Sequence, residues 1–528
     1  MRTDTDKAQL YDRQLRLWQK DGQTALENAQ VVVFGSSTLA SESLKNLVLP
    51  GVGQFVVIDD ALISDSDIRT NFFVRTADCG RSRAQVIVDN LCEMNPDVRG
   101  RAIAQAPSEF VKQSGPDSEL LDSASLVVAC AQPEAVVRAL AARCWAANIP
   151  MIAVANAGFI AELRTAVREH TIVESHASGR QDLRVMAPFT ALREFADSVD
   201  LDSLDSTDLA HVPLVLLLIK AVDKWAATNN TKPSGLKPAQ TAEVAALLRQ
   251  MAPTPGEENF EEAANAANAN CTGYAIPDEV KAILDDAAAK TINAQTSNFW
   301  LLVSALRRYL ESEHSQGMLP HSGAIPDMKA DTASYVSLQR IYKQKAESDK
   351  RQLLCHLHEV LHDAALPADH VSSEQLDAFC KNASKLRLVR TRSLAEDAGE
   401  SSVAQELQAE GVLSHYALFR AADKFAAKHG RYPGIADAET PMDELCVQDT
   451  QELLNLAQDL VSAWQIDEKV SSDLAAEFVR SGFMELHNMS AVAGGVVAQE
   501  AIKLITHQYV PHNGICIIDT ANNFMVSC

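Results

Sequence analysis

Short apolar runs alternate with amphipathic stretches along the first third of the chain. The apolar runs read as buried strands at Val31–Phe34, Phe55–Ile58, Ser125–Ala131 and Met151–Asn156. Helical spacing follows the first run over roughly residues 39–48 and the third run over residues 133–147. Continuously apolar strands that alternate with helices are typical of a mostly parallel sheet with helices on both faces. The pattern therefore predicts an α/β domain.

Beyond about residue 190 the spacing becomes that of amphipathic helices. Helices are expected near residues 213–227, 298–312, 333–361, 374–384 and 414–429, and the tract Ala263–Asn270 is expected to be a loop or weak helix. The α/β pattern returns with a helix near residues 491–506 and a strand at Gly514–Asp519. We therefore expect residues 1–168 and 483–528 to form one α/β domain, interrupted by a mostly helical insertion over residues 169–482.

Composition narrows the possible partners. The chain has 528 residues, 47% of them apolar, which is enough for two or three domains with real cores. Its net charge of −23 argues against nucleic acid, because phosphate binding needs clustered Lys and Arg. The longest apolar run, Val212–Ile219, is too short to cross a membrane. The polar start and ten cysteines without a CxxC pair predict reduced thiols in a cytosolic or nuclear protein.

The first turn resembles a dinucleotide-binding loop that has lost its glycines. The template places glycines at positions 35, 37 and 40, followed by an acid about 20 residues later. This chain has Gly35, Ser37 and Ala40, with Asp59 ending the next strand. Alanine is accepted at the third position, but the Cβ of Ser37 obstructs the approach of a phosphate. We therefore expect a Rossmann-like scaffold with a degenerate nucleotide site, and no cofactor bound by this chain.

Two other patterns carry possible chemistry. His358, Glu359 and His362 match H-E-x-x-H, which on a helix places two imidazoles on one face and would make a zinc hydrolase. No third histidine follows at the required spacing, so the favoured interpretation is a solvent-exposed helix surface that binds no metal. Cys355 has nearby histidines, but inert thiols are favoured over a nucleophile.

The two ends of the α/β domain carry further candidates. Arg13 and Arg16 share a face of the expected N-terminal helix. This face is either solvent-exposed without a function or carries an arginine that binds phosphate. Near the C-terminus small residues gather on one expected helix, where they indicate either core packing or a subunit interface: Ala491, Ala493, Gly494, Gly495 and Ala498.

Several of these segments resemble activating enzymes for ubiquitin-like proteins. They are YDRQLRLW (11–18), KNLVLPGVGQFVVID (45–59) and GGVVAQEAIKLIT (494–506). IPDMKADTASYVSLQRIY (325–342) and DKFAAKHGRYPG (423–434) are similar to the regulatory subunits of neddylation-activating enzymes. The resemblance spans nearly the whole chain. It implies a ThiF-type adenylation fold and a heterodimer with a catalytic activating subunit.

The same resemblance locates the departures from an active site. The family loop G-x-G-G-L-G falls on residues 35–40, so Ser37, Thr38 and Ala40 replace glycines. Thr70 stands where the family has a phosphate-binding arginine, and Arg83 where it has a lysine. Gln132 stands where the family has its magnesium-binding aspartate. These departures imply that the chain does not adenylate a modifier itself. The expected insertion also contains no recognisable catalytic-cysteine motif.

The resemblance also implies a role in trans. Arg13 matches the arginine of the family's Y-x-R-Q motif, which reaches the ATP of the partner subunit. The partner would hold ATP and Mg²⁺, adenylate the ubiquitin-like modifier of neddylation and take it onto a cysteine. This chain would stabilise the partner and help to bind the modifier. A regulatory subunit for another modifier and an autonomous adenylating homodimer are the alternatives within the family.

Overall fold

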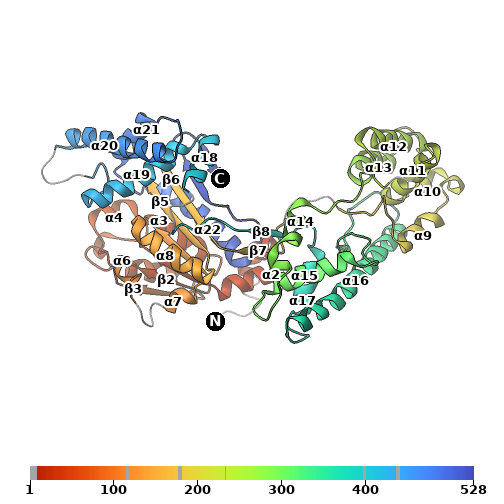
Figure 1. Ribbon diagram of the computed structural model, residues 1–528, viewed down its shortest axis with the longest axis horizontal. Helices are drawn as coiled ribbons and strands as arrows, with labels where there is room; N and C mark the ends of the chain where they lie inside the picture. The colour runs from red at the N-terminus through yellow and green to blue at the C-terminus, as the bar shows by residue number, and fades with distance from the viewer. Residues whose placement is uncertain are drawn as a thin grey trace. The chain divides into compact units, whose positions relative to one another are not determined.

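The computed structural model describes residues 7, 9–113, 119–176, 181–231, 234–395, 400–435 and 441–527. The chain forms two compact units, Met1–His170 with Val389–Cys528, and Thr171–Leu388. The chain passes between the units through β7 (His170–Ile172) and β8 (Arg387–Val389), which pair in a two-stranded sheet (Figure 1). Each unit has its own apolar core.

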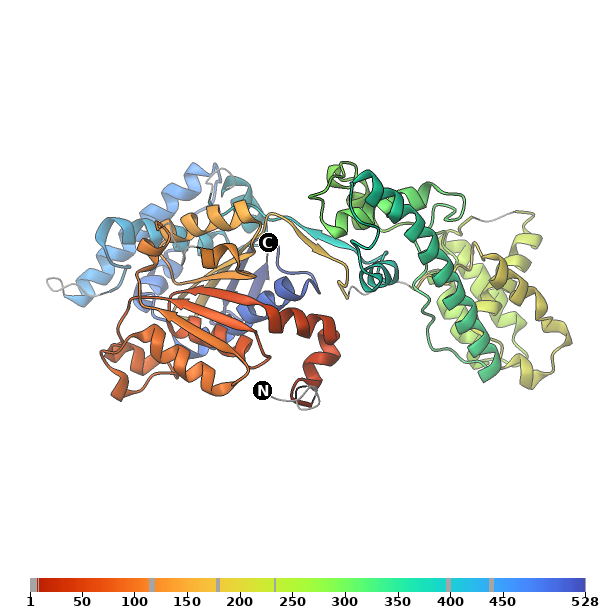
Figure 2. The same cartoon turned by 90° about the horizontal axis from the view of Figure 1, so that it is seen from below.

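The first unit is built on an eight-stranded sheet in the order β10-β9-β6-β5-β4-β1-β2-β3 (Figure 2). Its strands are β1 (Gln30–Phe34), β2 (Gln54–Ile58), β3 (Arg99–Ile103), β4 (Leu126–Cys130), β5 (Met151–Ala157), β6 (Ile160–Ala166), β9 (Ile515–Asp519) and β10 (Phe524–Ser527). Strands β1 to β5 are parallel, and β6, β9 and β10 pair antiparallel at one side. The predicted α/β class is confirmed.

The apolar β1 strand is buried on both faces, as its continuous hydrophobic sequence predicts. Its side chains alternate, so that Val31 and Val33 join a core with α3 and α22, whereas Val32 and Phe34 join a core with α8. Figure 1 shows these helices around the sheet. The helices of this unit are α2 (Asp12–Asn28), α3 (Thr38–Val48), α4 (Asp65–Thr70), α5 (Arg83–Met94), α6 (Pro107–Phe110), α7 (Glu119–Asp122), α8 (Glu134–Ala147), α18 (Glu400–Ala409), α19 (Leu413–His429), α20 (Met442–Ala463), α21 (Ser472–Ser481) and α22 (His487–Thr506).

Helices α18 to α21 pack on the antiparallel part of this sheet, although the sequence placed them in the insertion. Phe419 of α19 and Phe478 of α21 share a core with Ile160 and Ile517. The expected boundary at residue 168 lies close to the observed division after His170, but the expected return at residue 483 differs from the observed return at Val389. An amphipathic helix reveals that it has an apolar face, not which surface covers that face.

The second unit is helical. It comprises α9 (Thr190–Ser198), α10 (Ser206–Leu209), α11 (Leu214–Thr228), α12 (Pro238–Met251), α13 (Glu258–Asn270), α14 (Asp278–Asp285), α15 (Asn298–Glu311), α16 (Thr332–Asp363) and α17 (Ser373–Lys381). The tract expected to be a loop or weak helix lies in α13, where Ala263 and Ala267 are completely buried against α11 and α12. Among all described residues, no helix is long and apolar enough to span a bilayer.

Candidate functional site

The predicted nucleotide-site residues come together at one edge of the sheet. Strands β4, β1 and β2 are adjacent and parallel, so the turns after them lie side by side. These turns carry Gln132, Gly35 and Asp59, while α4 ends at Thr70 and α5 begins at Arg83. Ser37, Thr38 and Ala40 open α3 at the same edge. The predicted residues therefore lie together in the structure, and their role as a degenerate nucleotide site stays a prediction.

Gly35 makes the turn from β1 to α3, with φ at +94°. A Cβ built on Gly35 would lie 2.6 Å from the carbonyl oxygen of Cys130 and 2.7 Å from Nε2 of Gln132. The Gln132 amide itself donates to the Cys130 oxygen at 3.0 Å. The side chain at the family's magnesium position is therefore neutral and folded back onto its own strand, against the turn.

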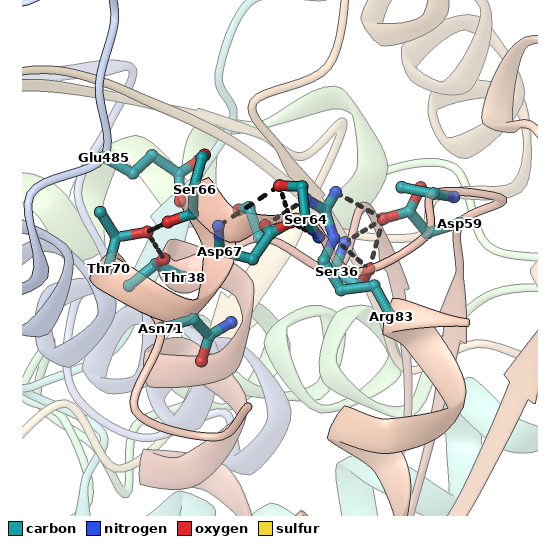
Figure 3. A network of polar contacts seen from close by, with 12 residues as sticks. Ser36, Thr38, Asp59, Ser64, Ser66, Asp67, Thr70, Asn71, Arg83 and Glu485 are labelled. Atoms are coloured by element: carbon teal, nitrogen blue, oxygen red, sulfur yellow. Dashed lines mark hydrogen bonds and ion pairs between the residues drawn. The ribbon is translucent and has the colours of Figure 1, made fainter. Parts of the chain in front are cut away.

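The N-terminus of α3 is occupied by a carboxylate from the same chain. Ser37 is the N-cap residue, but its side chain makes no capping hydrogen bond. The backbone N–H of Leu39 instead donates to Oε2 of Glu485 at 2.8 Å, and Figure 3 shows Glu485 close to Thr38 and Thr70. Helix N-termini attract anions, and in dinucleotide-binding folds this position holds phosphate. Glu485 thus lies where a phosphate group would otherwise be bound.

A second carboxylate, Asp59, is fully engaged by protein groups (Figure 3). Its Oδ2 accepts from the Ser36 backbone N–H at 2.9 Å and from Nη2 of Arg83 at 2.9 Å, and its Oδ1 accepts from the Ala61 N–H at 3.1 Å. The Ser36 hydroxyl also donates to Oδ2. Burial alone raises the pKa of Asp59, but Arg83 and Ser36 outweigh burial and hold that pKa below its ordinary value.

Arg83 extends this network to Asp67. Its Nη1 donates to Oδ1 of Asp67 at 2.8 Å, and its Nε donates to the Ser36 hydroxyl at 3.0 Å. Burial lowers the pKa of Arg83, but the two carboxylates outweigh burial and raise that pKa above its ordinary value. The guanidinium is therefore committed to neutralising two acids of its own chain. Loss of either contact would leave a buried charge poorly compensated.

The position where the family has a phosphate-binding arginine is occupied by an uncharged residue, Thr70. Thr70 Oγ1 lies 3.3 Å from Thr38 Oγ1 and donates to the Ser66 carbonyl oxygen at 3.2 Å. Asn71 next to it donates from Nδ2 to Ser41 Oγ at 3.0 Å. These groups do not fit a nucleotide and its metal. A triphosphate would be repelled by the Glu485 carboxylate at the N-terminus of α3, and Thr70 offers no positive charge to bind it.

Sequence reasoning missed three residues of the network: Ser36, Asp67 and Glu485. Ser36 and Asp67 lie next to motif positions, and Ser64 with Asp67 forms a capping box that is readable from the pattern S-x-x-D. Glu485 lies 446 positions from Leu39 and carries no local signal. Its identification required the fold.

The two N-terminal arginines have different surroundings. Arg16 forms an exposed ion pair with Asp12 at 2.9 Å. Arg13 is exposed and makes no hydrogen bond or ion pair with any described residue. The helix that carries them is anchored through Tyr11, which is buried and accepts from Nδ2 of Asn95 at 3.0 Å. Arg13 is therefore held at the surface by a fixed helix with its guanidinium available.

The run of small residues mainly serves packing within the chain. Helix α22 crosses α3 so closely that a Cβ on Gly494 would lie 2.8 Å from the backbone nitrogen of Ser43. Ala493 and Ala498 are buried in the same core. Packing within the chain therefore accounts for the small size of these three residues, and their place at a subunit interface stays a prediction. Ala491 and Gly495 are only half-buried, and their place at an interface stays a prediction.

The remaining candidates lie on the surface or in the core. His358, Glu359 and His362 are exposed on α16, and the described residues contain no group of three metal-ligating side chains. Cys355 is exposed, whereas Cys144 and Cys380 are buried, and burial raises the pKa of each of these two thiols to about 12. A thiol with such a pKa is a poor nucleophile. The geometry gives no support to a zinc hydrolase.

Comparison with known proteins agrees with this picture. The ThiF family model matches residues 11–527. A NEDD8-activating enzyme E1 regulatory subunit from Danio rerio is 35% identical over 523 residues, covering 96% of this chain and 96% of the relative. A subunit of the same name from Xenopus laevis is 33% identical, and the match covers 97% of this chain and 96% of the relative. The subunit from Drosophila melanogaster is 35% identical, and the match covers 96% of this chain and 94% of the relative. The chain therefore belongs to the ThiF family, in which it groups with the regulatory subunits of the NEDD8-activating enzyme.

Proposed function

We propose that this chain is the non-catalytic half of a heterodimer that activates NEDD8. In this proposal the catalytic partner holds ATP and Mg²⁺, adenylates the C-terminus of NEDD8 and transfers NEDD8 to one of its own cysteines as a thioester. The chain described here stabilises the catalytic subunit, helps to enclose the active site of that subunit and forms part of the surface that binds NEDD8. Its own nucleotide site takes no part in the chemistry.

The observation that carries the proposal is the contact between Glu485 and the N-terminus of α3. A phosphate group could reach Leu39 N–H only by displacing this carboxylate, which accepts its hydrogen bond at 2.8 Å. Arg83 stands where the family has a lysine, but its guanidinium is already bound to Asp59 at 2.9 Å and to Asp67 at 2.8 Å. An adenylation site needs free donors where negative charge develops. Here the donors are consumed within the protein.

The active contribution of the chain would come from Arg13. Adenylation develops negative charge on the phosphates, and a guanidinium can stabilise that charge with two parallel hydrogen bonds. Arg13 is exposed and without a partner among the described residues, whereas Arg16 is paired with Asp12. We therefore assign Arg13, rather than Arg16, to the ATP site of the catalytic subunit.

Reconstitution tests the division of labour. The chain is co-expressed with its catalytic subunit, and the complex is incubated with Mg·ATP and NEDD8 before non-reducing electrophoresis. We expect one reducible NEDD8 adduct, on the catalytic subunit. A reducible adduct on this chain would refute the assignment. Replacing NEDD8 by another ubiquitin-like modifier tests the alternative within the family, because a comparable adduct with that modifier would redirect the specificity.

A further inference from the structure

A cavity of about 450 Å³ lies in the helical unit, and no residue of the nucleotide site lines it. Its lining comes from Ser234 and from four segments: 181–187, 269–277, 318–324 and 381–387. All of these residues belong to the helical unit.

The lining of this cavity is basic in a strongly acidic protein. It contains the cations Arg184, Lys381, Lys385 and Arg387, and a single carboxylate, that of Asp182. The whole chain, in contrast, carries a net charge of −23. A concave surface lined by one sign of charge concentrates ligands of the opposite sign. The charge of the lining therefore indicates an anionic ligand.

Arg184 is the fixed member of this set. Its side chain is only 3% exposed, and its Nε forms an ion pair with Asp182 at 2.6 Å. Its Nη2 donates to the Leu319 carbonyl oxygen at 2.7 Å, and its Nη1 approaches the sulfur of Met318 at 3.1 Å. A guanidinium has five N–H donors, so two remain. The backbone of Arg184 has φ of +53°, a costly conformation that tends to be retained at functional positions.

The other three cations are poorly compensated. Lys381 and Lys385 lie at and just beyond the end of α17, and neither amine forms a hydrogen bond or ion pair with a described residue. Arg387 is 3.8 Å from the carboxylate of Glu279, at the limit of an ion pair, and its Nη1 donates to the Leu386 carbonyl oxygen at 2.8 Å. Paired surface cations gain little from a ligand, whereas unpaired ones gain a new contact. Lys381 and Lys385 can therefore accept carboxylates from outside, and Arg387 can exchange its long contact with Glu279 for a closer one.

Apolar side chains share the lining of the cavity with the cations. Tyr274 is 37% exposed, and its ring lies 5.3 Å from the Arg184 guanidinium carbon. Met186, Met318 and Pro320 also line the cavity. A phosphate site would gather donors around one point, usually with backbone N–H groups. Here the cations come from two segments far apart in the sequence, and apolar side chains share the lining with them, which suits an extended chain.

We propose that this cavity binds an acidic segment of a protein partner, with carboxylates at Lys381, Lys385 and Arg387 and apolar side chains against Tyr274 and Met318. The segment would be extended, because it would meet both the cations and the apolar side chains of the lining. This inference concerns the helical unit only and is independent of the adenylation chemistry proposed above.

The test uses the full chain and a short fluorescent peptide in which Glu alternates with Leu, followed by anisotropy. We expect saturable binding that weakens as salt is raised, because exposed charge pairs are screened. The double variant Lys381→Ala/Lys385→Ala should weaken the binding about tenfold, since each exposed pair contributes up to about 1 kcal/mol. Lys381 is exposed and Lys385 is half-buried, and neither amine has a partner among the described residues, so the fold should be retained, and circular dichroism checks this.

Three controls decide the outcome. Lys224→Ala/Lys343→Ala makes the same charge change at exposed lysines of the same unit that do not line this cavity, and it should bind the peptide like wild type. A peptide with Gln in place of Glu should not bind. Equal binding of the Gln peptide, or equal binding by the Lys381/Lys385 variant, overturns the proposal. Competition by inorganic phosphate at the same concentration as the peptide would reassign the cavity to a small anion.

Discussion

Glu485 accepts a hydrogen bond from the backbone N–H of Leu39 at 2.8 Å, and this contact joins the C-terminal segment to the first turn of α3. A carboxylate in this position satisfies one of the free N–H groups of the helix and interacts favourably with the helix dipole. The contact stabilises the turn and removes an anion site at the same time.

The isolated chain should bind Mg·ATP negligibly. The Glu485 carboxylate repels phosphate from the α3 N-terminus, Thr70 supplies no charge, and Asp59 is already bound by Arg83. Calorimetry with millimolar Mg·ATP should show no saturable heat. Micromolar affinity would show that the site rearranges to admit a nucleotide, and it would refute the proposed pseudo-site.

Glu485→Ala should destabilise the sheet unit by about 1–2 kcal/mol, the usual cost of losing a capping group or a charged hydrogen bond. Urea unfolding measures the loss. Glu485→Gln keeps an acceptor oxygen and should lose less. Glu477→Ala, at a half-buried position of α21 where the carboxylate pairs with the exposed Arg480, is the control and should change stability little. A wild-type midpoint for Glu485→Ala would mean that the contact contributes nothing to stability.

Gly494→Leu should destabilise the chain by about 1–3 kcal/mol, because a Cβ at this position already meets the α3 backbone at 2.8 Å. Thermal melting of the lone chain is sufficient to detect the loss, since the clash lies within one chain. Gly495→Leu is the control, because nothing lies within 4 Å of its Cβ position. Equal melting temperatures for the two variants would contradict the close crossing of α22 and α3.

Arg13→Ala should slow NEDD8-dependent pyrophosphate exchange by about 10–100-fold, which corresponds to one charge-assisted contact of about 1.5–3 kcal/mol. Assembly of the heterodimer should be unaffected, as gel filtration can show. Arg13→Lys should restore the rate only in part, because an ammonium lacks the planar fork of a guanidinium. Arg16→Ala should have a smaller effect. A wild-type rate in a fully assembled Arg13→Ala complex would show that Arg13 is a solvent-exposed residue without a role at the ATP site.

Asp423 provides a test of stability against pH. Burial raises the pKa of Asp423 to about 6, even though Arg420 lies 3.2 Å away. The unfolded pKa is about 3.9, so the folded state binds the proton more tightly, and Asp423 stabilises the fold less as pH rises from about 4 to 6. Asp423→Asn should therefore be more stable than wild type at pH 7.5, by about 1–3 kcal/mol, and should lose this advantage near pH 4.

Chemical unfolding at several pH values measures this difference. Asp443→Asn, at an exposed position of α20, is the control and should follow wild type at every pH. The neighbours of Asp423 include Glu134, whose pKa is lowered to about 2 because Arg164 and Arg420 outweigh its burial. That group loses its favourable interactions only in strong acid. A constant difference between Asp423→Asn and wild type would contradict the raised pKa.

Local features of the sequence predict the first half of the sheet and the positions at which the degenerate site is expected. The apolar run at Val31–Phe34, the turn at Gly35 and the acid at Asp59 are local features, and their spacing dictates a strand, a turn and a helix. Adjacent parallel strands then bring Gln132 to the same edge. The loss of the loop glycines at Ser37 and Thr38 was therefore readable without coordinates.

Only the tertiary structure decided which distant segments meet. Leu39 and Glu485 lie 446 positions apart, and no periodicity links them. Gly494 showed that something approaches α22 closely, but only the fold identified α3 as the neighbour. The apolar face of α19 likewise gave no sign that it covers the sheet unit. Periodicity records that a surface is buried, whereas the partner of that surface is chosen by packing across the whole chain.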